Sequence, residues 1–163
     1  MSRAILPPHG NFVLMKRNIE TTILINASLE AVWSVLIDFD QYPSWSPTVQ
    51  YFEGKPKVGE RTKVLLKQPN GMQIKMNPIF LNIDQDRELR WKGRLWMNGI
   101  FDGEHYFLLK SLPNGQTQLI QGELFSGILI PFLKKMIDGE TKNGFTLFNQ
   151  ALKDRVEKFV SEI

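Results

Sequence analysis

Apolar and polar residues alternate with period two over residues 19–25, and this pattern predicts a first strand. The spacing then becomes that of a helix, for which Ser28 is a suitable N-cap. One apolar face of this helix is formed by Val32, Val35, Leu36 and Phe39. The helix is expected to end before Pro43, because the residue before a proline is pushed out of the helical region.

Residues 48–124 have the pattern of consecutive strands joined by short turns. Asn-Gly, the strongest short hairpin signal, occurs three times in this stretch, at residues 70–71, 98–99 and 114–115. Neighbouring strands are therefore expected to be antiparallel. Pro78 lies inside the predicted strand 72–81 and indicates a bulge or an edge position there, since proline cannot donate a ladder hydrogen bond.

A long helix is predicted after Gly127, with Pro131 in its first turn. Helical spacing continues for about eight turns through the apolar residues Phe132, Leu133, Met136, Ile137, Phe145, Phe148, Leu152, Val156 and Phe159. Gly139 and Gly144 interrupt this helix, and two explanations stay open. They could mark a kink or a break between two helices, or they could clear room beside a bound ligand.

These elements follow one another as strand, short helix, consecutive strands and long C-terminal helix. A sheet with one apolar face and a helix with an apolar stripe bury both when the sheet curls around the helix. The sequence therefore predicts an α+β fold, in which a curved antiparallel sheet of about seven strands wraps around the C-terminal helix, with short helices after the first strand. The 163 residues are most simply one domain at 18–163 after an N-terminal extension at 1–17.

Composition excludes several classes of protein. The formal charge is +3, and no run of Lys or Arg marks a nucleic-acid surface, so no nucleic-acid partner is expected. There is no cysteine, which excludes disulfides and thiolate metal sites. No apolar stretch reaches the length of a membrane span, and the N-terminus lacks the apolar core of a secretory signal. A cytoplasmic protein is the default expectation.

Five short motifs carry a resemblance to a known family: Ala31-Val32-Trp33 through Asp38-Phe39, Tyr42-Pro43-x-Trp45-x-Pro47, Leu89-x-Trp91-x-Gly93, Gly103-Glu104-His105-Tyr106-Phe107 and Glu123-x-Phe125-x-Gly127. Over about residues 19–160 the chain resembles the helix-grip superfamily of START lipid-transfer domains, the birch-pollen allergen and the bacterial polyketide cyclase/dehydrase-like proteins (SRPBCC), above all the bacterial branch. The resemblance implies the helix-grip fold and an internal apolar cavity for a small hydrophobic molecule. It implies no particular reaction, because the family contains carriers, receptors and cyclases.

The two predicted strands that flank residues 114–115 carry the side chains that are candidates for catalysis or ligand binding. Counting back from this turn gives the expected cross-strand neighbours Leu109 and Leu119, Phe107 and Gln121, and His105 and Glu123. A His105–Glu123 pair facing a cavity could be a general acid and base, or could anchor the polar end of a ligand. It could equally be a structural pair that holds the sheet. No metal site and no cofactor are expected, because His9 is the only other histidine.

The predicted ligand-binding residues occupy the inward faces of the strands and of the C-terminal helix, with one aromatic residue at the mouth. They are Trp45 at the mouth and Val64, Leu66, Ile74, Met76, Trp91, Leu95, His105, Phe107, Leu119, Gln121, Glu123, Phe145 and Phe148. Trp96 lies on the opposite face of its strand, as a partner contact or a residue covered by the extension.

Three functional interpretations stay open. The favoured one is a non-enzymatic binding or transport protein for a small hydrophobic ligand such as a lipid or polyketide, since few reactive groups lie on the inward faces. The second is a small cyclase, dehydratase or hydrolase that uses His105 and Glu123. In the third, packing fills the cavity and the protein acts through its surface. The oligomeric state, monomer or homodimer, is open.

Overall fold

The computed structural model of the chain describes residues 15–95 and 97–162. Its elements are, in chain order, β1 (Met15–Ile25), α1 (Leu29–Ile37), η1 (Phe39–Gln41), α2 (Tyr42–Trp45), β2 (Val49–Phe52), β3 (Val64–Lys67), β4 (Gln73–Met76), β5 (Ile79–Asp84), β6 (Glu88–Leu95), β7 (Phe101–Ser111), β8 (Thr117–Gly127), α3 (Ile130–Met136), η2 (Ile137–Thr141) and α4 (Lys142–Ser161). The strand β1 begins at Met15, inside the segment that the sequence pattern assigned to the extension.

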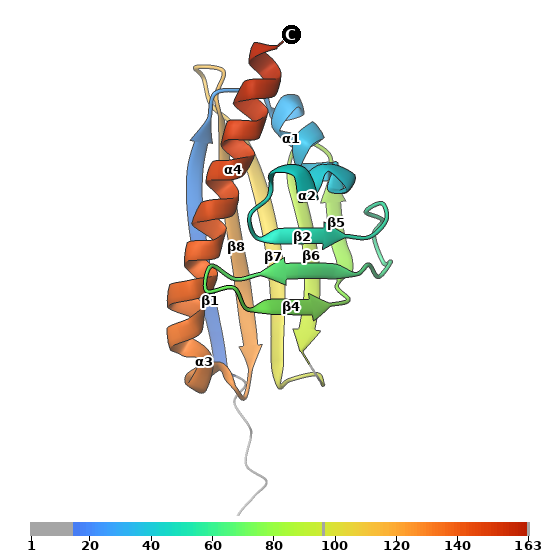
Figure 1. The fold of residues 1–163 in the computed structure, drawn as a ribbon, viewed down its shortest axis with the longest axis vertical. Coiled ribbons are helices and arrows are strands. Elements are labelled where there is room, and N and C mark those ends of the chain that lie inside the picture. The colour runs from blue at the N-terminus through green and yellow to red at the C-terminus, as the bar shows by residue number, and fades with distance from the viewer. Residues whose placement is uncertain (1–14, 96, 163) are drawn as a thin grey trace, which may run out of the picture.

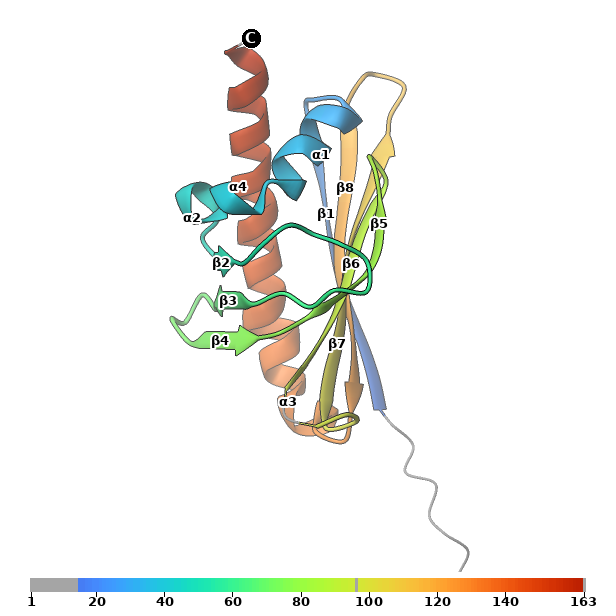
Figure 2. The ribbon, with the colours of Figure 1, turned by 90° about the vertical axis from the view of Figure 1, so that its right-hand side faces the viewer.

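The strands form two antiparallel sheets, one of five strands in the order β1-β8-β7-β6-β5 and one of three in the order β2-β3-β4. The helix α4 runs along one face of the larger sheet, and the smaller sheet crosses the same face beside it (Figures 1 and 2). The predicted α+β helix-grip fold is confirmed. The strands are divided between two sheets, however, where the pattern predicted one sheet of about seven strands.

Pro78 lies at the point where the chain passes from the smaller sheet to the larger one. The predicted continuous strand 72–81 is interrupted, because β4 ends at Met76 and β5 begins at Ile79. The amide of Thr62 donates to the carbonyl oxygen of Pro78 over 3.0 Å, so the break is fixed by a hydrogen bond from outside both strands. Proline ends the ladder here and allows the chain to change direction.

The helix α1 forms as its sequence predicts. The Oγ of Ser28 accepts a hydrogen bond from the amide of Ala31 over 3.3 Å, and the predicted apolar face is turned to the core. The helix ends at Ile37, before Pro43, but proline is not the reason. Tyr42 precedes this proline and still has helical dihedrals (φ −53°, ψ −42°), so it begins the short helix α2.

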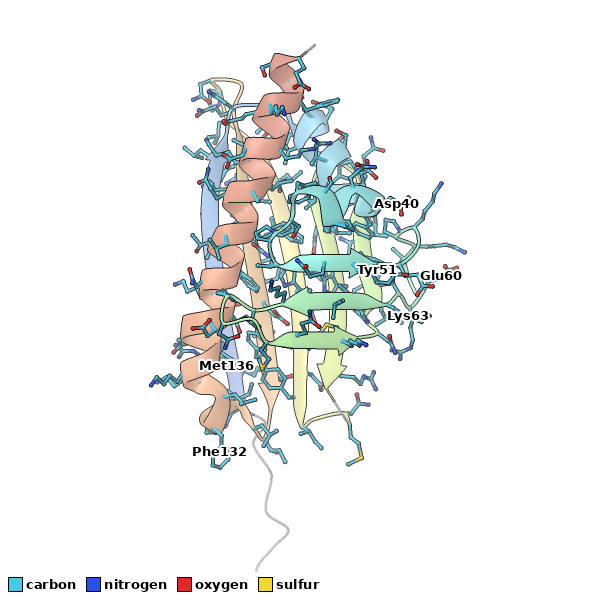
Figure 3. All side chains as sticks on the ribbon, in the orientation of Figure 1. Asp40, Tyr51, Glu60, Lys63, Phe132 and Met136 are labelled. Atoms are coloured by element: carbon cyan, nitrogen blue, oxygen red, sulfur yellow. The ribbon has the colours of Figure 1, made fainter. Side chains whose placement is uncertain are left out.

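Two clusters of buried side chains pack between α4 and the larger sheet. The first includes Leu89, Phe107, Phe148 and Leu152, and the second includes Ile19, Phe101, Phe125, Ile137 and Phe145. The long predicted helix is divided into α3, a π-helical turn at η2 and α4. The apolar face of this helix was predicted to begin at Phe132. Phe132 instead points away from the body of the protein (Figure 3) and is 82% exposed, so the buried face begins at Leu133.

Candidate functional site

A cavity of about 290 Å³ lies between the two core clusters. Its wall is formed by the larger sheet, the smaller sheet and the helical segments α3, η2 and α4. A volume at the lower end of the usual range for small-molecule sites suits a small compact ligand better than a lipid with two long chains.

Most of the predicted ligand-binding residues meet at this cavity. Its wall includes Val64, Leu66, Ile74, Met76, Trp91, His105, Phe107, Gln121, Glu123, Phe145 and Phe148. These residues come from both sheets and from α4, so folding brings together side chains up to 84 positions apart (Val64 to Phe148). The sequence pattern therefore selected the correct faces of these strands and of the helix.

Two predicted positions differ, and a third, Leu95, is not tested. Trp45 lies outside the cavity, because its ring packs against Tyr42 and Phe148 with centroids 4.9 and 5.2 Å apart and borders a separate depression beside α1. Leu119 is fully buried in the first core cluster and does not reach the cavity. The side chain of Leu95, like Trp96 and His9, lies outside the described residues.

Gly144, one of the two helix glycines for which a place beside a ligand was left open, also lines the cavity. The lining residues that the sequence pattern did not predict are Tyr42, Thr48, Val49, Lys67, Gln68, Met72, Phe101, Phe125, Leu133, Met136 and Thr141. Two of them carried a signal. Phe101 and Phe125 lie on the same strand faces as His105 and Glu123, at even spacing along β7 and β8. The residues of the turn after β3 carry no sequence pattern that predicts a place in the cavity wall. They line the cavity only because the smaller sheet packs beside α4.

The predicted register between β7 and β8 is confirmed, with His105 opposite Glu123 and Phe107 opposite Gln121. The Nδ1 atom of His105 lies 3.4 Å from Oε2 of Glu123, and its Nε2 atom lies 3.2 Å from Nε2 of Gln121. The Gln121 amide therefore donates to Nε2, and the Nδ1–H group donates to the Glu123 carboxylate. Both ring nitrogens are engaged within the protein.

Aromatic rings hold the imidazole of His105 in this position. Its plane lies 9° from that of the Trp91 indole, with centroids 4.6 Å apart, and the two residues are opposite each other in register. Phe107 and Phe145 each meet it edge to face with centroids 4.9 Å away. The polar pair is thus set in an aromatic wall, where a hydrogen bond is stronger than in water.

The two helix glycines differ in their relation to the cavity. Gly144 lines it, and a Cβ atom added there would lie 3.6 Å from Pro69 and 3.7 Å from Thr48, on the smaller-sheet side. Gly139 lies in the π-helical turn, and a Cβ atom added there would have no neighbour within 4 Å. Only Gly144 is therefore in a position to clear room for a ligand.

Within residues 15–95 and 97–162, no three His, Cys, Asp or Glu side chains are grouped so that they could hold a metal ion. Over the same ranges, none of the helices has both the length and the apolar character that a membrane crossing requires.

Comparison with known proteins gives one family and a set of similar folds. The sequence model of the family described as polyketide cyclase / dehydrase and lipid transport matches residues 16–157. None of the curated protein sequences matches the chain.

The similar solved structures include the Zhui aromatase/cyclase from a Streptomyces species (TM-score 0.71, 18% identity, 90% of this chain and 96% of that chain). A START superfamily protein from Mycobacterium smegmatis has a TM-score of 0.66 at 20% identity, over 87% of this chain and 98% of that chain. Norcoclaurine synthase from Thalictrum flavum, in complex with dopamine and hydroxybenzaldehyde, has a TM-score of 0.70 at 13% identity, over 97% and 98%. At these identities the likeness concerns the fold alone.

Proposed function

Because the chain belongs to the polyketide cyclase / dehydrase and lipid transport family, we propose that it binds a small hydrophobic molecule in the cavity between α4 and the two sheets. The observation that carries this proposal is the chemistry of the cavity wall. Apolar side chains from three parts of the fold face an open space, and one group of polar side chains, His105, Gln121 and Glu123, lies together on β7 and β8. Such a wall is typical of a ligand site, in which burial supplies affinity and a few polar groups supply orientation.

Binding is tested with the neutral fluorescent probe N-phenyl-1-naphthylamine. We expect saturable binding by the wild-type protein and at least about tenfold weaker binding by Ile74→Trp, since the larger ring would occupy the cavity. Lys75→Trp is the matched control, because Lys75 is the next residue of β4 and is exposed. Equal binding by wild-type and Ile74→Trp proteins, both folded by circular dichroism, would show that the probe does not enter the cavity and would end the proposal.

The natural ligand is sought by native mass spectrometry of the purified protein before and after extraction with organic solvent. A mass difference that extraction removes identifies a bound apolar molecule. The extracted molecule then becomes the competitor in the probe assay, where it should displace N-phenyl-1-naphthylamine from the wild-type protein and not from residual sites in Ile74→Trp.

The second candidate function is a small cyclase, dehydratase or hydrolase. The contact between His105 and Glu123 at the cavity wall supports it, because a histidine oriented by a carboxylate is a common general acid–base arrangement. Incubation of the extracted ligand with wild-type protein, His105→Ala and Glu123→Gln separates the two functions. Conversion by the wild type alone favours an enzyme, whereas an unchanged ligand in all three samples favours a binding protein.

A further inference from the structure

The polar part of the cavity wall presents hydrogen-bond acceptors that the protein does not use. Gln121 is 3% exposed, and its Oε1 atom has no hydrogen-bond partner among the described residues, since only its Nε2 atom contacts His105. The carboxylate of Glu123 accepts from His105 through Oε2, and the described residues contain no donor bonded to its Oε1 atom. Leaving the buried Oε1 atom of Gln121 without a donor costs free energy, and the half-buried Glu123 carboxylate has room for a further donor, so a partner from a ligand is favoured here.

A glycine determines where the Glu123 carboxylate lies. Gly103 lies on the same face of β7 as His105, and a Cβ atom added there would overlap the Oε1 atom of Glu123. Only the absence of a side chain at Gly103 leaves this space for the carboxylate. The overlapping atom is the end of a flexible side chain, so an added methyl group would move the carboxylate without breaking the sheet.

Gly93 is the partner of Gly103 in the register of β6 and β7, and it provides a comparison. A Cβ atom added at Gly93 would lie 3.0 Å from the sulfur of Met76 and would not meet the carboxylate. The two opposite glycines thus leave space in the same part of the sheet. The space at Gly93 is taken by the thioether of Met76, and the space at Gly103 is taken by the carboxylate of Glu123.

The remaining polar groups of the wall belong to other elements. Thr48, Lys67 and Gln68 lie on or beside the smaller sheet and are exposed or half-buried, and Thr141 lies on η2. Apart from the indole N–H of Trp91, the polar groups that the larger sheet contributes are His105, Gln121 and Glu123, and the free atoms among these three are acceptors.

We infer that this cavity selects an apolar molecule that carries a hydroxyl group, which donates to Glu123, and that it rejects ligands with a carboxylate at this end. This inference rests on the proposed function and adds the chemical class of the ligand. A hydroxyl supplies the missing donor, whereas a carboxylate would bring a second negative charge into a low-dielectric site beside Glu123.

The test compares three ligands with the same fused ring in displacement of N-phenyl-1-naphthylamine at neutral pH: 2-naphthol, 2-methylnaphthalene and 2-naphthoate. Methyl and hydroxyl are close in size, and the methyl compound is the more hydrophobic. We expect 2-naphthol to bind at least about tenfold more tightly than 2-methylnaphthalene, because its hydrogen bond is to a charged acceptor. We expect 2-naphthoate to bind more weakly than either.

Variants connect this preference to the carboxylate. Gly103→Ala should lose most of the preference for 2-naphthol over 2-methylnaphthalene, and Gly93→Ala should retain it. Glu123→Gln should bind 2-naphthoate at least about tenfold more tightly than the wild type does, since the negative charge is removed and an amide donor is added.

The outcomes separate this inference from the proposed function. If the probe does not bind the wild-type cavity, the proposed function fails. If the probe binds but 2-naphthol is no better than 2-methylnaphthalene, or 2-naphthoate competes as well as 2-naphthol, the selection for a hydroxyl is overturned. Equal loss of preference in Gly93→Ala and Gly103→Ala would also overturn it, because the position of the carboxylate would then not be the cause.

Discussion

The indole ring of Trp91 and the imidazole ring of His105 are stacked, with 4.6 Å between their centroids and 9° between their planes. This stack forms part of the cavity wall, so a ligand that enters the cavity changes the surroundings of Trp91 directly. The same stack holds the imidazole in the plane from which it donates to Glu123.

Intrinsic fluorescence should therefore report on occupancy of the cavity. We expect the tryptophan emission of the wild-type protein to change when a transparent hydrocarbon such as decalin is added, and the change to be lost in Trp91→Phe. Trp33→Phe is the control, because Trp33 is equally buried on α1 but does not line the cavity. A change that persists in Trp91→Phe and disappears in Trp33→Phe would place the hydrocarbon elsewhere.

Tyr42 of α2 forms a hydrogen bond to the backbone of α1. Its hydroxyl donates to the carbonyl oxygen of Leu36 over 2.5 Å, and its side chain is fully buried. Tyr42→Phe leaves this carbonyl without its donor and should lower the free energy of unfolding by about 1–3 kcal/mol in urea denaturation. Tyr51→Phe should change it by less than about 0.5 kcal/mol, since Tyr51 is exposed on β2 (Figure 3). Equal effects would contradict the role of the Tyr42 hydroxyl.

Alkaline pH should destabilise the fold through the same residue. Burial, followed by the negative charge of Asp38, raises the pKa of Tyr42 far above its ordinary value. The unfolded chain loses this proton above about pH 10 while the folded chain keeps it, so stability is full below that pH and falls as the pH rises further.

The comparison of wild-type protein with Tyr42→Phe isolates this effect from other titrating groups. The wild type should lose up to about 1.4 kcal/mol more per pH unit above pH 10 than the variant does, as measured by urea denaturation at several pH values. Parallel curves for the two proteins would show that Tyr42 ionises equally in both states.

Two glycines should respond to alanine in opposite directions. At Gly144 the added Cβ meets its neighbours at ordinary contact distances, and alanine favours a helix interior, so Gly144→Ala should stabilise the protein by up to about 1 kcal/mol. At Gly122 the added Cβ would overlap the ring of Tyr106, whose hydroxyl donates to Glu20, so Gly122→Ala should destabilise it. Thermal unfolding of both variants measures the difference. A loss of stability in Gly144→Ala would mean that α4 approaches the turn after β3 more closely than the structure shows.

Local signals in the sequence predicted much of the fold. The Asn-Gly pair at 114–115 lies in the turn between β7 and β8, and Gly115 has a φ of +81°, the conformation for which glycine is suited. Since the turn and the alternation of side chains together define a register, counting back from it paired His105 with Glu123 correctly. The cap and the apolar face of α1 were predicted for the same reason, because both depend on neighbours within one or two turns.

No local sequence signal predicted which strands distant in the chain would pair. The strand β1 pairs with β8 from Met15 opposite Gly127 to Ile25 opposite Thr117, and no turn connects them. The separation of β2, β3 and β4 into their own sheet also depends on contacts with the rest of the fold. Pro78 indicated an irregularity, but whether a bulge, an edge or a change of sheet follows is decided by what the chain packs against.

By itself, the sequence determined the family, the order of helices and strands, the face of each element that turns inward, and the meeting of His105 with Glu123. Only the tertiary structure decided that Trp91 stacks on His105, that Gly103 makes room for the Glu123 carboxylate, and that Trp45 packs outside the cavity. The physical reason is that periodicity and turn chemistry act between near neighbours, whereas a cavity is the space that remains where elements distant in the chain do not meet. Its shape and its unpaired acceptors follow from how α4 and the smaller sheet lie on the larger one.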